Sequence, residues 1–212
     1  AMQAPSAGNQ QMYTIIDVQD KKLQETLSKT CDNQPFINQA KMVLIFCADF
    51  QKWYDLFNYE NCNPRKPGVG DLLLATTDAT IAAQNAVVAA ESLGIGSCYI
   101  GDIPEQHDLH RELLHLPEYV VPVCMLVLGY PADDHFKRQK PERCKLEDIV
   151  CVDHYQRKNE QELKNMFEHK VGNKKLSEWT EAFCKRKYNS DFSKEMTHSV
   201  QKYIDQFKSE AD

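Results

Sequence analysis

Three stretches of this sequence combine residue types and spacings that suit the binding of a polar ligand. The first, Pro5-Ser6-Ala7-Gly8-Asn9, predicts a tight loop that offers backbone amides, a hydroxyl and a carboxamide. The second, Gly94 to Gly101, is spaced with glycines after a helix, so its backbone can approach a ligand closely. The third is a basic cluster able to hold a phosphate, formed by Lys137, Arg138, Lys140, Arg143 and Lys145. The plainer interpretations are a turn, a strand end and a solvated charged loop.

Side chains that could act as acid, base, nucleophile or metal ligand do not form a recognised constellation. His107, His110 and His115 lie on or near one predicted helix, but their spacing does not match a metal-binding pair. The sequence has no Gly-x-Ser-x-Gly nucleophile elbow, no Walker A loop and no Gly-x-Gly-x-x-Gly motif. An enzyme without such groups depends on a cofactor for its chemistry, and the sequence favours that hypothesis.

Composition narrows the class of protein. The 212 residues suffice for one sizeable domain, and 42% hydrophobic with 26% charged residues is ordinary for a globular protein. A net charge of -6 disfavours a general attraction to nucleic acid or to an anionic membrane. No uninterrupted apolar run approaches the length of a membrane span, and no signal peptide opens the sequence. We therefore predict a soluble, cytoplasmic protein without nucleic acid or membrane partners.

The eight cysteines are predicted to be reduced thiols. No pair forms Cys-x-x-Cys, and several lie in apolar segments, where a free thiol behaves as a small hydrophobic group. The same spacing argues against zinc and iron–sulfur sites. We expect neither disulfides nor a metal.

The sequence alternates between strand patterns and helix patterns, which predicts an α+β or α/β fold. Strands are expected over residues 12–18, 41–48 and 120–128, and helices over residues 21–29, 77–93 and 104–114. The strand at 41–48 is continuously apolar and is therefore expected to be central. Thr77 or Asp78 could cap the helix at 77–93, and Gly94 could end it. Its small residues predict close packing on several sides, including a second subunit. Residues 51–70 predict a surface excursion with little regular structure.

The character of the sequence changes at Asp133, where a charged and irregular segment begins. Residues 157–212 are polar and helical in pattern, as the spacing of Leu163, Met166 and Phe167 indicates. This tail has too little apolar material to fold alone. We therefore predict a core over residues 1–156 and a helical extension over residues 157–212 that packs on the core or on a partner subunit.

Several blocks taken together resemble the nitroreductase family. They are the loop at 5–9, Gln34–Ala40 before a strand, Ala83–Gly96, Tyr99–Gly101 and Leu128–Ala132. Their order and spacing are most similar to the NADPH-preferring, oxygen-insensitive nitroreductases and flavin reductases. The resemblance covers residues 1–157 well and the tail loosely. The combination is specific, although no single block would be.

The resemblance implies an α+β fold in which helices flank a central mixed β-sheet, with a helical C-terminal extension and an intertwined homodimer. FMN would be bound at the subunit interface by both chains. NAD(P)H would deliver a hydride to the flavin and leave, and a nitroaromatic, a quinone or free flavin would then take the electrons in the same pocket. This ping-pong reaction needs no catalytic side chain, because backbone amides near the flavin stabilise its reduced form.

The resemblance also implies which residues bind. Those expected beside the flavin ring or ribityl chain are Pro5, Ser6, Asn9, Gln34, Pro35, Phe36, Tyr99, Ile100 and Gly101. Arg143 and Lys140 are expected near the FMN phosphate. The match of Lys140 is less direct, because Pro141 stands at the position of the family's lysine and Lys140 is one residue before it. Lys174 and Lys175 fall where relatives carry a basic pair that meets the 2′-phosphate of NADPH.

Relatives begin with a helix and an Arg-Arg-Ser-x-Arg-like segment that holds the FMN phosphate, and the sequence as given lacks both. It is either a fragment, which we expect, or an abbreviated member of the family. Each lost contact with the phosphate would weaken FMN binding by roughly 1.5–3 kcal/mol. Two alternatives to the enzyme stay open. One is a flavin-binding or regulatory protein without rapid turnover, and the other is a structural homologue without cofactor.

Overall fold

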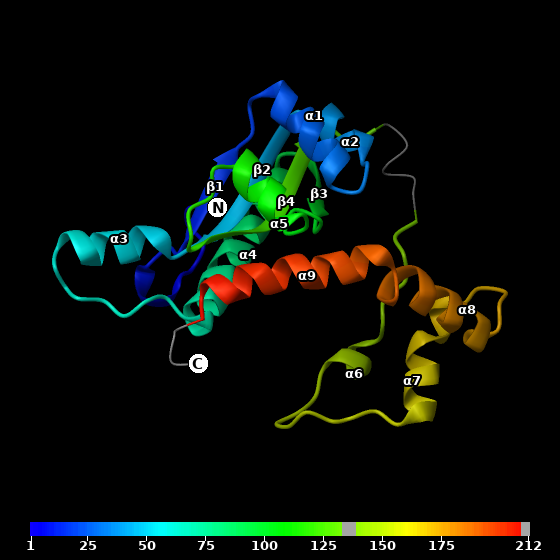
Figure 1. Cartoon of the computed structure of the whole chain (residues 1–212). Coiled ribbons are helices and arrows are strands. Elements are labelled where there is room, and N and C mark those ends of the chain that lie inside the picture. Colours follow the sequence, from blue (N-terminus) through cyan, green and yellow to red (C-terminus); the bar gives the residue numbers. More distant parts are fainter. Residues whose placement is uncertain (133–138, 209–212) are drawn as a thin grey trace. The chain divides into compact units, whose positions relative to one another are not determined.

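The computed structural model describes residues 1–132 and 139–208, which belong to two compact units (Figure 1). Unit 1 contains Ala1–Ala132 and the last helix from Glu195 onward, and unit 2 contains the described residues between them. This division differs from the predicted one at residues 156 and 157. The last helix belongs with unit 1 because Tyr203, together with Phe207, is buried in the core of that unit.

Unit 1 is built on a four-stranded sheet. Its strands are β1 (Tyr13–Asp17), β2 (Met42–Asp49), β3 (Gly96–Ile100) and β4 (Val120–Gly129), in the order β1-β2-β4-β3. The predicted α+β class and the central place of β2 are confirmed. The expectation of a mixed sheet is wrong for the described residues, in which every pairing is antiparallel. β2 and β3 do run in the same direction, but β4 lies between them and pairs with both.

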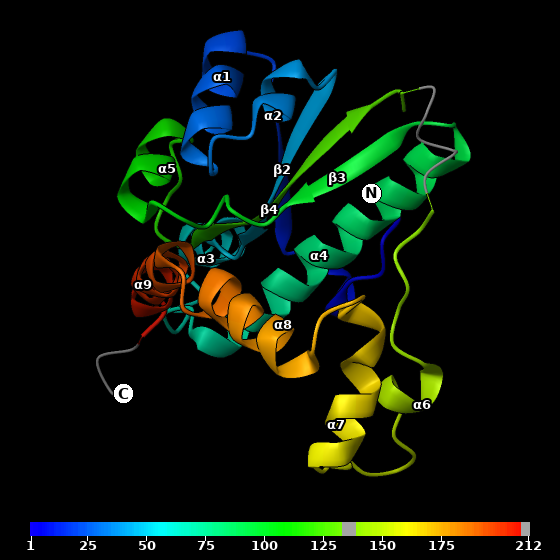
Figure 2. The same ribbon diagram turned by 90° about the vertical axis from the view of Figure 1, so that its right-hand side faces the viewer.

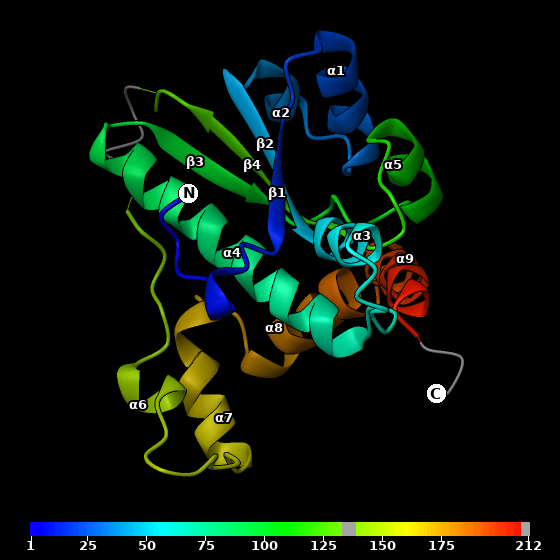
Figure 3. The ribbon, with the colours of Figure 1, turned by 90° about the vertical axis from the view of Figure 1, so that its left-hand side faces the viewer.

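One face of the sheet is covered by the helices α1 (Lys21–Thr30), α2 (Pro35–Gln39) and α5 (His107–Leu113), as Figures 2 and 3 show. Val43 and Ile45 of β2 point to this face and pack against Leu27 of α1 and Ile37 of α2, all fully buried. Because side chains alternate along a strand, the next residue, Phe46, points to the opposite face. The apolar side chains of β2 thus pack in the core on both faces of the sheet.

The opposite face is covered by α4 (Val69–Ser92). Ala79, Ala82 and Ala83 of this helix are fully buried against Phe46 and Leu126. Such small side chains let the helix approach the strands closely. At one end of the sheet, α9 (Asp191–Gln206) adds Tyr203 to a cluster with Met12, Leu72 and Tyr119.

The prediction of irregular structure over residues 51–70 is wrong for much of that range. Gln51–Tyr59 form the helix α3, and α4 begins at Val69. The aromatic residues of α3 have tertiary partners, because the indole N–H of Trp53 donates to the carbonyl of Gln10 at 2.9 Å. Local sequence patterns do not reveal such a contact, and the prolines and glycines nearby obscured the helix.

Both ends of α4 are fixed by local hydrogen bonds. The prediction that Thr77 or Asp78 caps this helix is wrong, because the helix starts earlier, where the carboxylate of Asp71 accepts from the backbone N–H of Gly68 at 2.7 Å. The guanidinium of Arg65 also binds this carboxylate and lowers its pKa. The predicted end at Gly94 is confirmed, since this residue has a φ of +72° and donates to the carbonyl of Glu91.

α4 is also, in the described part of the chain, the one helix that is long and apolar enough to cross a membrane by length and composition alone. Core helices of globular proteins pass the same test. α4 packs on the sheet and carries two buried carboxylates, Asp71 and Asp78. Its contacts are those of a core helix.

All eight cysteines are unpaired in the structure, in agreement with the prediction of reduced thiols. Burial raises the pKa of Cys31 and of Cys47 to about 12, and that of Cys124 to about 11. These thiols are therefore protonated at neutral pH and act as small core residues.

Unit 2 consists of short helical elements. They are α6 (Leu146–Ile149), α7 (Glu160–Phe167), the short turn η3 (Glu168–Lys170), α8 (Leu176–Phe183) and the turn η4 (Cys184–Tyr188). The helix predicted around Leu163 and Phe167 is confirmed as α7. Among its described residues, no hydrophobic side chain is fully buried. That residues 157–212 cannot fold alone stays a prediction.

Candidate functional site

The N-terminal loop, with Pro5, Ser6 and Asn9, is held against α4 by one buried carboxylate. An oxygen of Asp78 accepts hydrogen bonds from the hydroxyl of Ser6 at 2.5 Å and from the backbone N–H of Met12 at 3.1 Å. The Ser6 oxygen in turn accepts from the backbone N–H of Gln11 at 2.7 Å, so both ends of the loop are tied. The hydroxyl proton of Ser6 is therefore engaged within the chain. Asn9 and Pro5 are exposed, and the side chain of Asn9 has no hydrogen-bond partner among the described residues.

The second group of predicted residues lies at the start of α2, on the other face of the sheet. Gln34 precedes the helix, Pro35 opens it, and Phe36 is 41% exposed. The amide nitrogen of Gln34 donates to the carbonyl of Cys31 at 2.8 Å and to a carboxylate oxygen of Asp102 at 2.7 Å. Asp102 follows Gly101, so this contact brings α2 to the end of β3.

β3 is an edge strand, because it has β4 as its neighbour on one side and no described strand on the other. Its outer backbone groups are therefore available to a ligand. Tyr99 points toward α4, where its hydroxyl donates to the side-chain oxygen of Gln84 at 3.3 Å, while Ile100 is buried in the opposite face. A Cβ added at Gly101 would meet open space, so nothing within the described chain requires a glycine there. The strand end thus offers an exposed backbone that a flat ligand could approach.

Within one copy of the chain, the predicted residues fall into separate groups. The group with Gln34 and Gly101 is joined through Asp102, whereas the Ser6 group is joined to α4 through Asp78. α4 covers one face of the sheet and α2 the other, and no described contact links the two groups.

The predicted phosphate residues belong to unit 2 and are not placed relative to unit 1. Lys140 and Arg143 are exposed, while Lys137 and Arg138 lie outside the described residues. Arg143 lines a polar cavity of 330 Å³ with Lys145, but three carboxylates line it too, those of Glu142, Asp148 and Glu168. The charge of these neighbours does not favour a phosphate in this arrangement of unit 2.

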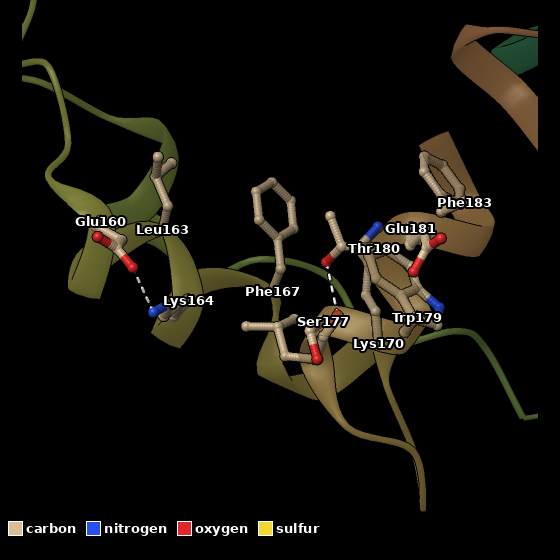
Figure 4. A pocket seen from close by; sticks show the side chains of 11 residues that line it. Glu160, Leu163, Lys164, Phe167, Lys170, Ser177, Trp179, Thr180, Glu181 and Phe183 are labelled. Carbon is tan, nitrogen blue, oxygen red and sulfur yellow. Dashed lines mark hydrogen bonds and ion pairs between the residues drawn. The ribbon is translucent and has the colours of Figure 1, made fainter. Parts of the chain in front are cut away.

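A cavity of unit 2 lies between α7 and α8 and has a volume of 1110 Å³ (Figure 4). Its walls carry the rings of Phe167, Trp179 and Phe183, of which the last two stack at 4.9 Å. The predicted NADPH residues Lys174 and Lys175 immediately precede α8 but do not line this cavity. The arrangement therefore leaves their predicted role untested.

Two carboxylates, the buried Glu105 and the half-buried Glu195, lie where the segment after β3 meets α9. Glu195 accepts from the backbone N–H of Gln106 at 3.0 Å and from the hydroxyl of Ser199 at 2.6 Å. One oxygen of Glu105 and the second oxygen of Glu195 are buried without a hydrogen-bond partner among the described residues. Burial, then the charges of Glu195, Asp102 and Asp32, raises the pKa of Glu105 to about 7.

We expect the variant Glu105→Gln to be more stable than the unchanged chain above pH 7. A carboxyl group whose pKa is raised by folding, here from 4.5 to about 7, favours the folded state below pH 4.5 and loses this contribution as the pH rises through 7. The advantage of the variant should therefore grow from pH 5 to pH 8, to about 2–3 kcal/mol. Urea unfolding at several pH values measures it, and a difference that does not vary with pH would contradict the assignment.

Sequence reasoning missed the roles of two aspartates, Asp78 and Asp102. The sequence did indicate a role for Asp78, because it is an acidic residue within an alanine-rich helix. A carboxylate that is buried in such a helix needs hydrogen-bond donors. For Asp102, the sequence indicated no role except through its position next to Gly101. Its partner Gln34 is 68 positions away in the sequence.

Comparison with known proteins gives a consistent result. The sequence profile of the nitroreductase family matches residues 1–130. The "FMN reductase [NAD(P)H]" of Bacillus subtilis is 41% identical over 143 residues, which are 65% of this chain and 56% of that protein. The "Oxygen-insensitive NADPH nitroreductase" of Salmonella typhimurium is 38% identical over 125 residues, 58% of this chain and 50% of that protein. The chain thus spans about half the length of the curated relatives it matches.

Solved structures agree with these relatives. NfrA2 of B. megaterium superimposes with a TM-score of 0.79 at 32% identity, over 98% of this chain and 86% of that one. NfrA1 of the same organism gives a TM-score of 0.77 at 28% identity, over 95% and 85% of the two chains. The similarity therefore extends beyond the residues that the family profile covers.

Proposed function

The chain belongs to the nitroreductase family, and we propose that it is an FMN-dependent NAD(P)H oxidoreductase that reduces a small aromatic acceptor. We propose nitroaromatics, quinones and free flavin as the classes of acceptor. Relatives named as an NAD(P)H-dependent FMN reductase and an NADPH nitroreductase support the reaction class. The observation that carries the proposal is the exposed end of β3, where Gly101 lies beside the hydrogen-bonded pair of Gln34 and Asp102. We also propose a cytoplasmic location.

The candidate residues of unit 1 offer hydrogen-bonding groups and aromatic rings that suit a flavin. The edge strand β3 offers backbone groups to the polar rim of the ring, and Gly101 leaves room for close approach. Phe36 and Tyr99, 41% and 40% exposed, could pack on the ring, while Asn9 offers a free carboxamide to it or to the ribityl chain. Lys140 and Arg143 remain the proposed phosphate ligands, and the side chain of Arg143 would have to turn away from the carboxylates that line its cavity.

When bound, FMN would accept a hydride from NAD(P)H and pass the electrons to the acceptor. The chain itself has to bind, orient and shield the reactants. Backbone amides at the end of β3 would stabilise negative charge on the ring, because preorganised donors act without rearranging. Pro5 and the loop that Asp78 holds would close one side of the site. Lys174 and Lys175 are proposed to meet the 2′-phosphate of NADPH as a pair of positive charges.

We further propose that the active form is a homodimer in which α4 faces a second copy. The outer face of this helix is exposed and carries the large apolar side chains Val69, Leu73, Leu74 and Val88, of which Leu73 is 67% exposed. Apolar surface of this extent along one helix is typical of a protein interface. A second copy there would also explain why the Ser6 and Gln34 groups do not meet within one chain.

The purified full chain is expected to be yellow, or to become yellow when FMN is added, and to lose this colour when NADPH is added. FMN fluorescence should be quenched as the chain is titrated in. A chain that is folded by circular dichroism, yet quenches no FMN fluorescence at micromolar concentration, would contradict the cofactor and favour the structural homologue. Full FMN occupancy without bleaching by NADPH in a stopped-flow experiment would favour the flavin-binding alternative instead.

A further inference from the structure

We propose that Asp102 is a positioning residue for Gln34, and that it makes the carboxamide of Gln34 an acceptor for an N–H group of the flavin ring. The inference rests on the proposed function, since it takes the ligand to be FMN. It goes further in assigning a role to Asp102 and a direction to the hydrogen bond of Gln34.

The orientation of the Gln34 carboxamide follows from its two partners. Its nitrogen lies 2.8 Å from the carbonyl oxygen of Cys31 and 2.7 Å from a carboxylate oxygen of Asp102. A carbonyl and a carboxylate can only accept hydrogen bonds, so the nitrogen of Gln34, and not its oxygen, has to face them. Both N–H bonds of the amide are then in use.

The carboxamide oxygen of Gln34 is left as its free polar atom, because it has no hydrogen-bond donor among the described residues. Gln34 is half-buried, so this oxygen is available to a ligand. An acceptor selects a ligand that carries a donor, and the pyrimidine ring of a flavin has one N–H between two carbonyl groups. The edge of β3 ends beside Asp102 and can supply donors to such carbonyls.

The bond between Gln34 and Asp102 also joins two walls of the proposed site. Gln34 stands at the start of α2, whereas Asp102 follows β3 by two residues. Without Asp102, one N–H of Gln34 would lose its partner, and the side chain could turn either end toward the ligand. The carboxylate therefore restricts Gln34 to the orientation with its oxygen free.

The test is the variant Asp102→Asn in the full chain. Asparagine has the same shape but offers both a donor and an acceptor, so either end of Gln34 can face it. The measurement is FMN binding by fluorescence quenching, compared with FMN methylated at the ring N–H, which cannot donate. We expect the unchanged chain to bind FMN about 10-fold more tightly than the methylated form, since this corresponds to one hydrogen bond. In D102N this preference should fall to about 3-fold or less.

The matched control is Asp17→Asn, which makes the same change of charge at an exposed residue whose carboxylate, in the described part of the chain, accepts a hydrogen bond from Gln19 alone. It should keep the full preference. Equal binding of FMN and its methylated form by the unchanged chain would overturn the inference even if D102N failed to fold. An undiminished preference in D102N would overturn the role of Asp102. A chain that binds neither flavin would refute the proposed function itself.

Discussion

Replacing Asp78 with alanine is expected to lower the free energy of unfolding by about 2–4 kcal/mol and to release the N-terminal loop. The carboxylate is 3% exposed and accepts from both the hydroxyl of Ser6 and the backbone N–H of Met12. Without it, the buried N–H of Met12 loses its partner, and a buried donor without a partner costs about 1–3 kcal/mol. Loss of the second hydrogen bond, to Ser6, adds to this. Urea unfolding followed by tryptophan fluorescence measures the change.

The control for this prediction is Asp78→Asn. The asparagine oxygen can still accept from Met12, so the loss of stability should be about half as large or less. The alanine variant should also bind FMN more weakly, because the loop that carries Ser6 and Asn9 is no longer fixed. An alanine variant as stable as the unchanged chain would mean that Asp78 does not hold the loop.

Placing two glutamates on the outer face of α4, with Leu73→Glu and Val88→Glu, is expected to convert the proposed dimer to a monomer. These side chains are 67% and 57% exposed in the single chain, so the fold should tolerate the change. In a symmetric dimer each substitution occurs twice, and each places an unpaired charge in an apolar interface. We expect the dissociation constant of the dimer to rise at least about 100-fold, which corresponds to about 3 kcal/mol. Light scattering after gel filtration measures the mass.

Leu56→Glu is the matched control, since Leu56 is a 46% exposed leucine that belongs to α3 and not to α4. This variant should remain a dimer. FMN affinity should fall together with dimerisation in the double variant, because the proposed site draws on both copies. A double variant that is still dimeric, or a monomer that binds FMN as before, would contradict the proposed arrangement.

Much of the secondary structure of unit 1 followed from local patterns in the sequence. The apolar run of β2 identified the central strand, because only a strand covered on both faces can carry such side chains throughout. Gly94 marked the end of α4, since the left-handed backbone there favours glycine. The blocks that resemble the nitroreductase family identified the candidate residues, although a resemblance gives no geometry.

The tertiary structure decided what depends on contacts between distant residues. Prolines and glycines over residues 51–70 suggested a loop, but residues 51–59 form a helix, and Trp53 of this helix donates a hydrogen bond to the distant Gln10. The antiparallel pairing of the sheet depends on β4 lying between β2 and β3, which no local pattern encodes.

The candidate site shows the same division. The sequence by itself determined which side chains are present, among them Ser6, Gln34 and the two aspartates. Only the fold brings Asp78 to Ser6 and Asp102 to Gln34, over 72 and 68 positions of sequence. A carboxylate's role depends on the donors around it, and those donors come from other elements of the chain. For this reason the residue types could be read in advance, while their functions had to come from the packing.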